Sequence, residues 1–152
     1  MKENIRWIEK AFSELTVEEL YALLRLRTEV FVVEQNCVFQ DMDNKDQQSR
    51  HLMGWVGNDL VAYVRILPAG LSYDEPSIGR VVSDPRYRGL GAGRLLMEEA
   101  IRRTLALHGA LPIRIGAQLY LKKFYGSLGF EAQGDIYLED GIEHIEMVRQ
   151  PA

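Results

Sequence analysis

Apolar residues recur along this chain with helical spacing in two places. From Leu20 to Phe31 they follow one another at intervals of three and four residues, which predicts an amphipathic helix. Thr16 and Glu19 have the spacing of a capping box, so this helix should begin there. A longer stripe predicts a second helix from about Gly91 to His108, which Gly109 would end.

Shorter apolar runs bounded by turn residues predict strands. Two runs between Leu52 and Leu67 flank Gly57-Asn58-Asp59, which is typical of a hairpin turn. Two closing strands should meet in a second hairpin at Glu139-Asp140-Gly141. The other expected elements are a strand near residues 5–12, strands at Ser77–Ser83 and Ile113–Gly116, a short helix through Leu119–Ser127, and closing strands around Phe130–Leu138 and His144–Arg149. This order favours a mixed sheet covered by helices.

Composition narrows the class of protein. The 152 residues are 47% hydrophobic and 26% charged, which is typical of a globular protein and predicts a single domain over residues 1–152. The formal net charge of -4 disfavours nucleic acids and anionic membranes as partners. Cys37 is the only cysteine, and no apolar leader stands near the N-terminus. We therefore expect a cytoplasmic protein.

Glycines at alternate positions, Gly89, Gly91 and Gly93, stand between a predicted strand and the predicted long helix. Glycine lets the backbone approach a ligand closely, and the first amides of a helix have no partner within the helix. Such a turn attracts anions. Arginines suited to several phosphate charges surround it: Arg86, Arg88 and Arg94. The pattern therefore predicts a phosphate-binding loop.

Other ligand motifs do not fit. A Walker loop requires Lys-Ser or Lys-Thr, which this chain lacks, and a dinucleotide fingerprint requires a glycine where Arg94 stands. The acidic run at residues 41–46 fails as a calcium loop, because Lys45 occupies a ligand position and Leu52 replaces the bidentate glutamate. Cys37 and the three histidines lack the spacing of metal ligands, so no metal is expected.

With its glycine-rich turn and the residues around it, the sequence resembles the GNAT N-acetyltransferase superfamily. The pyrophosphate motif of that family, Arg/Gln-x-x-Gly-x-Gly/Ala, is matched by Arg88, Gly91 and Gly93. A second family element, an aromatic-Tyr-x-x-x-Gly-Phe ending, is matched by residues 124–130. Residues 27–35, 115–118 and 141–145 are similar to the ElaA-like subgroup in particular.

The resemblance implies the acyl-CoA N-acyltransferase fold, an α/β fold with a mixed twisted sheet of about six to seven strands flanked by about four helices. Two central strands splay apart in that fold and admit acetyl-CoA between them. The residues expected to bind acetyl-CoA are Val81, Val82, Arg86, Arg88, Gly89, Leu90, Gly91, Ala92, Gly93, Arg94, Gln118, Phe124 and Tyr125. Gln118 stands where the family commonly has asparagine.

Acetyl transfer to an amine needs a proton donor for the departing thiolate, donors for the oxyanion, and a base. The resemblance assigns the proton donor to Tyr125 and the oxyanion contact to the amide of Val82. The candidate bases are Glu34, Glu75, His51 and His144. Glu34 is preferred, because partial burial at the end of an apolar helix could raise its pKa.

The expected function is transfer of the acetyl group of acetyl-CoA to a primary amine of a small molecule or peptide. The alternative is an acyl-CoA-binding sensor on the same fold that has lost turnover, and Tyr125 together with the available acidic residues favours the enzyme. Acidic side chains in the segment from Val33 to Asp46 are expected to attract a cationic acceptor. The sequence is compatible with a homodimer and does not itself determine the oligomeric state.

Overall fold

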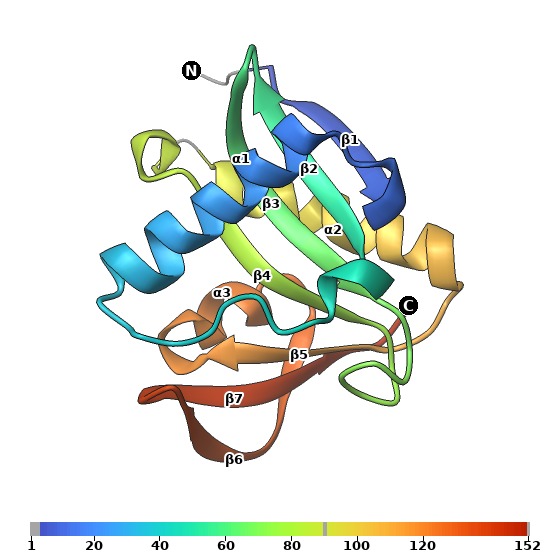
Figure 1. Ribbon diagram of the computed structural model, residues 1–152. Helices are drawn as coiled ribbons and strands as arrows, with labels where there is room; N and C mark the ends of the chain where they lie inside the picture. Colours follow the sequence, from blue (N-terminus) through green and yellow to red (C-terminus); the bar gives the residue numbers. More distant parts are fainter. Residues whose placement is uncertain (1–3, 90, 152) are drawn as a thin grey trace.

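The computed structural model describes residues 4–89 and 91–151, in which seven strands form one mixed sheet (Figure 1). The strand order is β1-β2-β3-β4-β5-β7-β6. The strands are β1 (Arg6–Ala11), β2 (Arg50–Val56), β3 (Asp59–Leu67), β4 (Ser77–Ser83), β5 (Ile113–Gln118), β6 (Phe130–Glu139) and β7 (Ile142–Arg149). Their order along the chain and both hairpins are as predicted.

Three α-helices occur in these ranges, as the residue patterns predict and one fewer than the approximate number that the family resemblance implies. They are α1 (Val17–Arg27), α2 (Ala92–His108) and α3 (Lys122–Gly126). The first predicted helix changes type, because α1 continues as a π-helical segment, Thr28–Glu34. The last predicted helix is shorter than expected, since β5 runs on to Gln118 and a 3₁₀ turn, Leu119–Leu121, precedes α3.

The capping box at the start of α1 forms as predicted. The amide of Glu19 donates to Thr16 Oγ1 at 3.1 Å, and the amide of Thr16 donates to Glu19 Oε1 at 2.8 Å. Two of the amides that a helix start leaves without a partner are thereby satisfied. At the end of α2, Gly109 has φ of 88°, a conformation that favours glycine over other residues.

The two long helices cover opposite faces of the sheet, with α1 in front and α2 behind in Figure 1. The face under α2 carries the larger core, in which Leu96 and Met97 pack with Val64 and Ile66 of β3. The other face carries a smaller core, in which Tyr63 packs with residues of α1. Tyr63 and the next residue, Val64, thus serve different cores, because side chains alternate across a strand.

The sheet opens at its centre, where β4 and β5 run parallel. Their register contains a single pair, Ser77 with Arg114, whereas every other neighbouring pair of strands is antiparallel and forms a longer ladder. Beyond Ser77, β4 therefore has no strand partner on its β5 side. Backbone groups along that edge remain available to a ligand, since unpaired strand edges offer N–H and C=O groups. The expected splay of two central strands is present.

Candidate functional site

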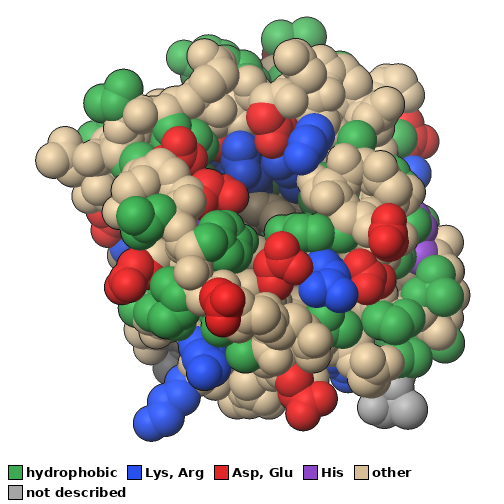
Figure 2. Space-filling view, turned by 90° about the horizontal axis from the view of Figure 1, so that it is seen from below, with side chains coloured by type: hydrophobic (Ala, Val, Ile, Leu, Met, Phe, Trp, Pro, Cys, Tyr) green, Lys and Arg blue, Asp and Glu red, His purple; other side chains and the backbone are tan. Residues whose placement is uncertain are grey.

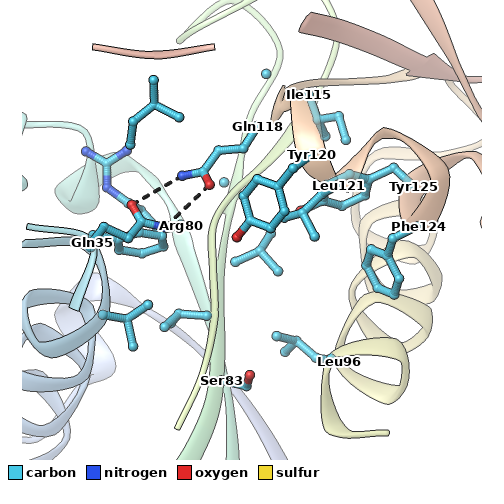
Figure 3. Close-up of a pocket in the computed structure, with 18 of the residues that line it drawn as sticks. Gln35, Arg80, Ser83, Leu96, Ile115, Gln118, Tyr120, Leu121, Phe124 and Tyr125 are labelled. Atoms are coloured by element: carbon cyan, nitrogen blue, oxygen red, sulfur yellow. Dashed lines mark hydrogen bonds between the residues drawn. The ribbon is translucent and has the colours of Figure 1, made fainter. Parts of the chain in front are cut away.

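A cavity of about 900 Å³ lies where β4 and β5 diverge (Figure 3). This is within the range of ligand pockets in proteins. Figure 3 shows Leu96, Leu121 and Phe124 toward one end, which we call the apolar end. Gln35, Arg80 and Gln118 lie toward the other, which we call the polar end.

The glycine-rich turn has the conformation that an anion site requires. Gly89 and Gly91 have φ of 83° and 80°, which side-chain-bearing residues rarely adopt. The first hydrogen bond of α2 runs from the amide of Leu95 to the carbonyl of Gly91, and no side chain caps the helix. The amides of Ala92, Gly93 and Arg94 therefore have no partner within the helix. Leu90, expected to bind the cofactor, lies outside the described residues.

Arg88 and Arg94 line the cavity and Arg86 does not. The guanidinium of Arg86 turns back onto Asp84, at 2.8 Å. Arg94 donates to Ser127 Oγ at 3.0 Å, lies 3.7 Å from Glu98 Oε2, and its side chain is 47% exposed. Arg88 forms two hydrogen bonds with Glu34, of 2.5 and 2.7 Å. Two of the three expected arginines thus stand beside the turn.

Glu34 does not have the environment that made it the preferred base. Its side chain is 43% exposed, and its hydrogen bonds to Arg88 hold its pKa below the ordinary value of a glutamate. The expectation of a raised pKa was therefore wrong, because an arginine 54 residues away in the sequence stabilises the carboxylate. Glu34 joins the end of the π-helical segment to the glycine-rich turn.

Tyr125 lies between the apolar end and the core, in T-shaped contact with Phe124 and Phe130 at ring distances of 5.2 and 6.0 Å. Only 5% of the residue is exposed. Burial raises the pKa of the hydroxyl above its ordinary value, and the nearby Tyr120 adds to this rise. The phenol is therefore fully protonated at neutral pH and faces the cavity.

The Gln118 side chain points across the cavity instead of along it. Its amide exchanges two long hydrogen bonds with the amide of Gln35, of 3.3 and 3.4 Å (Figure 3). A second contact crosses nearby, from Cys37 Sγ to the carbonyl of Asp140 at 3.3 Å. The segment after the π-helix is thus connected to β5 and to the β6–β7 turn around the polar end.

The structure separates the other three candidate bases. His51 is buried, donates from Nε2 to the carbonyl of Asp46 and accepts at Nδ1 from the hydroxyl of Tyr63, so it has no free ring nitrogen. Glu75 does not line the cavity and binds Arg114 at 2.9 Å. His144 alone of the three lines the cavity, stacked on Tyr137 at 5.7 Å.

His144 also has a defined tautomer. Its Nδ1 lies 2.7 Å from the carbonyl of Ile142, which can only accept, so Nδ1 carries a proton whether the ring is neutral or charged. In the neutral ring Nε2 is therefore the acceptor. His144 stands opposite Gln118 in the β5–β7 register, which places it near the polar end.

The acidic segment does not offer free negative charge to an acceptor. Asp41 binds Arg27 and Arg80, at 2.9 and 2.7 Å, and Asp43 binds Arg65 at 2.6 Å. Asp46 bridges Arg27 and Arg65, at 2.9 and 3.0 Å. The premise for a cationic acceptor was therefore wrong. The sequence interpretation missed these three arginines, although Arg27 and Arg65 were visible as charges within otherwise apolar stripes.

The described ranges contain no group of three or more histidine, cysteine or acidic residues that could hold a metal ion. Among the helices of residues 4–89 and 91–151, none is both long and apolar enough to cross a membrane.

Several known proteins are similar to this chain in sequence, in architecture or in both. Residues 11–150 match the family model of an acetyltransferase (GNAT) domain. Protein ElaA of Escherichia coli (strain K12) is 43% identical over 148 residues, which are 96% of this chain and 97% of ElaA. The crystal structure of an acyl-CoA N-acyltransferase from Pseudomonas aeruginosa is 44% identical, with a TM-score of 0.92 over 96% of this chain and 99% of that one. An aminoglycoside 6'-N-acetyltransferase complexed with coenzyme A has the same fold, at 15% identity and a TM-score of 0.70 over 95% and 97% of the two chains.

Proposed function

Because the chain belongs to the GNAT acetyltransferase family, we propose that it transfers the acetyl group of acetyl-CoA directly to the primary amine of a small molecule or peptide. The observation that carries this proposal is the placement of the glycine turn, the free amides of α2 and a buried tyrosine hydroxyl around one cavity between splayed strands. A cytoplasmic location belongs to the same proposal.

The residues present fit acetyl-CoA. Apart from its neighbours along the chain, a Cβ built on Gly89, Gly91 or Gly93 would meet no atom of residues 4–89 and 91–151 within 4 Å, so each has space for a ligand beside it. The amides of Ala92, Gly93 and Arg94, with Arg88 and Arg94 beside them, would hold the pyrophosphate. Val81, Val82 and Phe124 would border the pantetheine arm. Bound there, acetyl-CoA supplies a thioester carbonyl that an amine can attack.

Two groups of the chain then stabilise charge. The oxygen that becomes negative would meet an amide on the side of β4 without a β5 partner. Val82, to which the resemblance gave this contact, pairs with Tyr63 of β3, and the amide of Asp84 two residues on donates to the carbonyl of Val61 at 2.8 Å. Because backbone groups alternate along a strand, the amides of Val81 and Ser83 are directed to the open side, and one of them would donate. The hydroxyl of Tyr125 keeps its proton at neutral pH and would donate it to the sulfur as the thiolate departs. Both groups act in a partly enclosed cavity, where hydrogen bonds to developing charge are stronger than in water.

His144 is our candidate for the base, in place of Glu34. An alkylamine has a pKa near 10.4, so removing its proton at neutral pH costs about 5 kcal/mol. The free Nε2 of the neutral ring can accept that proton, whereas the carboxylate of Glu34 is already engaged by Arg88. The stacked ring of Tyr137 and the carbonyl of Ile142 hold the imidazole in place.

The proposal is tested by measuring thiol release from acetyl-CoA against a panel of primary amines, with product masses recorded. We expect release that depends on the amine and a product heavier by one acetyl group. Tight acetyl-CoA binding without amine-dependent release would instead favour the non-catalytic sensor. Absence of both binding and release would overturn the proposal and the sensor alternative.

We predict that His144→Asn lowers kcat/KM at neutral pH by about a hundredfold, the lower end of the range for general acid–base catalysis. The asparagine amide can still donate to the Ile142 carbonyl, but the acceptor at Nε2 is gone. The loss should shrink above pH 10, where the amine loses its own proton. His108→Asn, at the end of α2 and off the cavity, is the matched control. Equal kcat/KM values for the two variants would eliminate His144 as the base.

A further inference from the structure

Arg80 reaches the cavity from a distorted part of β4. In the β3–β4 register Tyr63 pairs with Val82 and Arg65 with Gly79, so Arg80 and Val81 stand opposite the single residue Val64. Arg80 has φ of 53°, a left-handed conformation that is costly for a residue with a side chain. Bulges and strained residues of this kind concentrate next to functional sites, where they redirect a side chain.

The Arg80 guanidinium is held along one edge and open along the other. Nε donates to Asp41 Oδ1 at 2.7 Å, and Nη2 donates to the Asp41 carbonyl at 2.8 Å and to Asp43 Oδ2 at 3.4 Å. The Phe39 ring lies 5.7 Å from the guanidinium carbon. Nη1 has no acceptor among the residues that the structure describes. Arg80 lines the cavity, and Figure 3 draws it beside Gln35 and Gln118 at the polar end.

The aspartates around Arg80 at the polar end of the cavity are balanced by an equal number of arginines. Arg27, Arg65 and Arg80 face Asp41, Asp43 and Asp46, three cations against three anions. A bound carboxylate would therefore not meet uncompensated aspartates. In Figure 2, basic side chains lie between acidic ones around a hollow in the surface.

The β6–β7 turn adds negative charge at the same cavity, through Glu139 and Asp140. These two carboxylates favour an ammonium group and disfavour an acceptor that carries only negative charge. The titratable His144 lies on the adjacent part of β7. The polar end therefore offers a free donor for an anion and acidic groups for a cation.

We propose that the acceptor is a small zwitterion of the amino-acid class, a primary amine with a carboxylate a few bonds away that binds the open Nη1 edge of Arg80. This inference rests on the proposed acetyl transfer and names its acceptor. The amides of Val81 and Ser83, one of which is assigned to the oxyanion, follow Arg80 by one and three residues on β4, about 3 to 10 Å at the rise of an extended strand. A carboxylate held by Arg80 thus places a nearby amine beside the amide assigned to the oxyanion.

A structural role is the competing explanation, in which Arg80 only fastens the segment of Asp41 and Asp43 to the sheet. The two explanations differ in what they predict for substrate choice. Loss of a fastening would lower the rates of all acceptors together, because fewer molecules would have an intact site. Loss of a carboxylate contact would lower the rate of acids alone.

The test compares each of several amino acids with its own carboxamide, taking the ratio of the two kcat/KM values. This ratio does not depend on the fraction of active protein. The carboxamide has the less basic amine and more of it uncharged, so a preference for the acid is not caused by amine basicity. We expect the wild-type protein to prefer acids by about tenfold or more, as for a charge-assisted hydrogen bond.

The ratio should fall to about one in Arg80→Gln and take an intermediate value in Arg80→Lys, which keeps the charge but loses the planar donor edge. Arg103→Gln is the matched control. Arg103 is 24% exposed against 19% for Arg80, also binds two carboxylates, and does not line the cavity. Its variant should keep the wild-type ratio.

Carboxamides that match or outperform acids in the wild-type protein would overturn this inference and leave the proposed function standing. A ratio that is unchanged in both Arg80 variants would also overturn it. If Arg80→Gln does not fold, the acid-to-carboxamide ratios of the wild-type protein and of Arg80→Lys still test the inference. If no amine of any kind supports thiol release, the proposed function is overturned, and this inference is overturned with it.

Discussion

Replacing Gly93 by valine is expected to weaken acetyl-CoA binding by at least about a hundredfold, or more than about 2.7 kcal/mol. Gly93 lines the cavity on the first turn of α2, and a Cβ there would meet no described atom within 4 Å other than those of its own helix turn. The added isopropyl group would therefore fill space assigned to the pyrophosphate and separate it from the helix amides. Isothermal titration calorimetry with acetyl-CoA measures the loss.

The same substitution can be made where it should change nothing. Gly126 is a helical glycine in α3 with open space around its Cβ position, and it does not line the cavity. Both variants should unfold at denaturant concentrations near that of the wild type, since valine is not worse than glycine inside a helix. Gly91→Val is less informative, because its φ of 80° adds backbone strain. Wild-type affinity in Gly93→Val would remove the phosphate site from this turn.

Replacing Tyr125 by phenylalanine is expected to lower kcat by about 10² to 10⁴ while leaving acetyl-CoA affinity within about threefold. The ring keeps its contacts with Phe124 and Phe130, so packing is preserved. In the proposed reaction the lost hydroxyl would act on charge that develops at sulfur only in the transition state. Its removal therefore affects kcat more than ground-state binding. Single-turnover rates, with affinity measured separately, distinguish the two effects.

The matched control removes a hydroxyl from an exposed tyrosine. Tyr21 on α1 is 73% exposed and does not line the cavity, so Tyr21→Phe should keep wild-type rates. The raised pKa of Tyr125 adds a further expectation, because the hydroxyl remains protonated across the neutral range and should contribute no titration between pH 6 and 9. A loss below about threefold in Tyr125→Phe, with chemistry rate-limiting, would leave proton donation to water.

Local patterns in the sequence were sufficient for most of the fold. Strand and helix periodicities produced the observed order of elements, because each depends on neighbours within a few residues. The capping box of Thr16 and the helix-ending Gly109 were predicted for the same reason. The π-helical continuation of α1 was not predicted, since its apolar spacing also suits an α-helix.

The glycine-rich turn before α2 shows how much of a site local sequence can predict. Alternating glycines before a helix require only the backbone geometry of one segment, and Gly89 and Gly91 have the positive φ that such a turn uses. The side chains around the turn were less predictable. Arg86 turns back onto Asp84, two residues away, and Arg88 binds Glu34. Nothing in the spacing of these arginines distinguishes them.

The sequence by itself thus determined the order of the elements, the glycine turn at the start of α2 and the position of Tyr125 in its motif. Only the tertiary structure decided which charges meet. Arg80 and Asp41 are 39 residues apart, and Arg88 and Glu34 are 54 apart. Long-range ion pairs depend on how strands and loops are folded together, and they set the pKa of a carboxylate and the free edge of an arginine. The left-handed bulge that directs Arg80 into the cavity likewise arises from strand pairing, which a single sequence does not display.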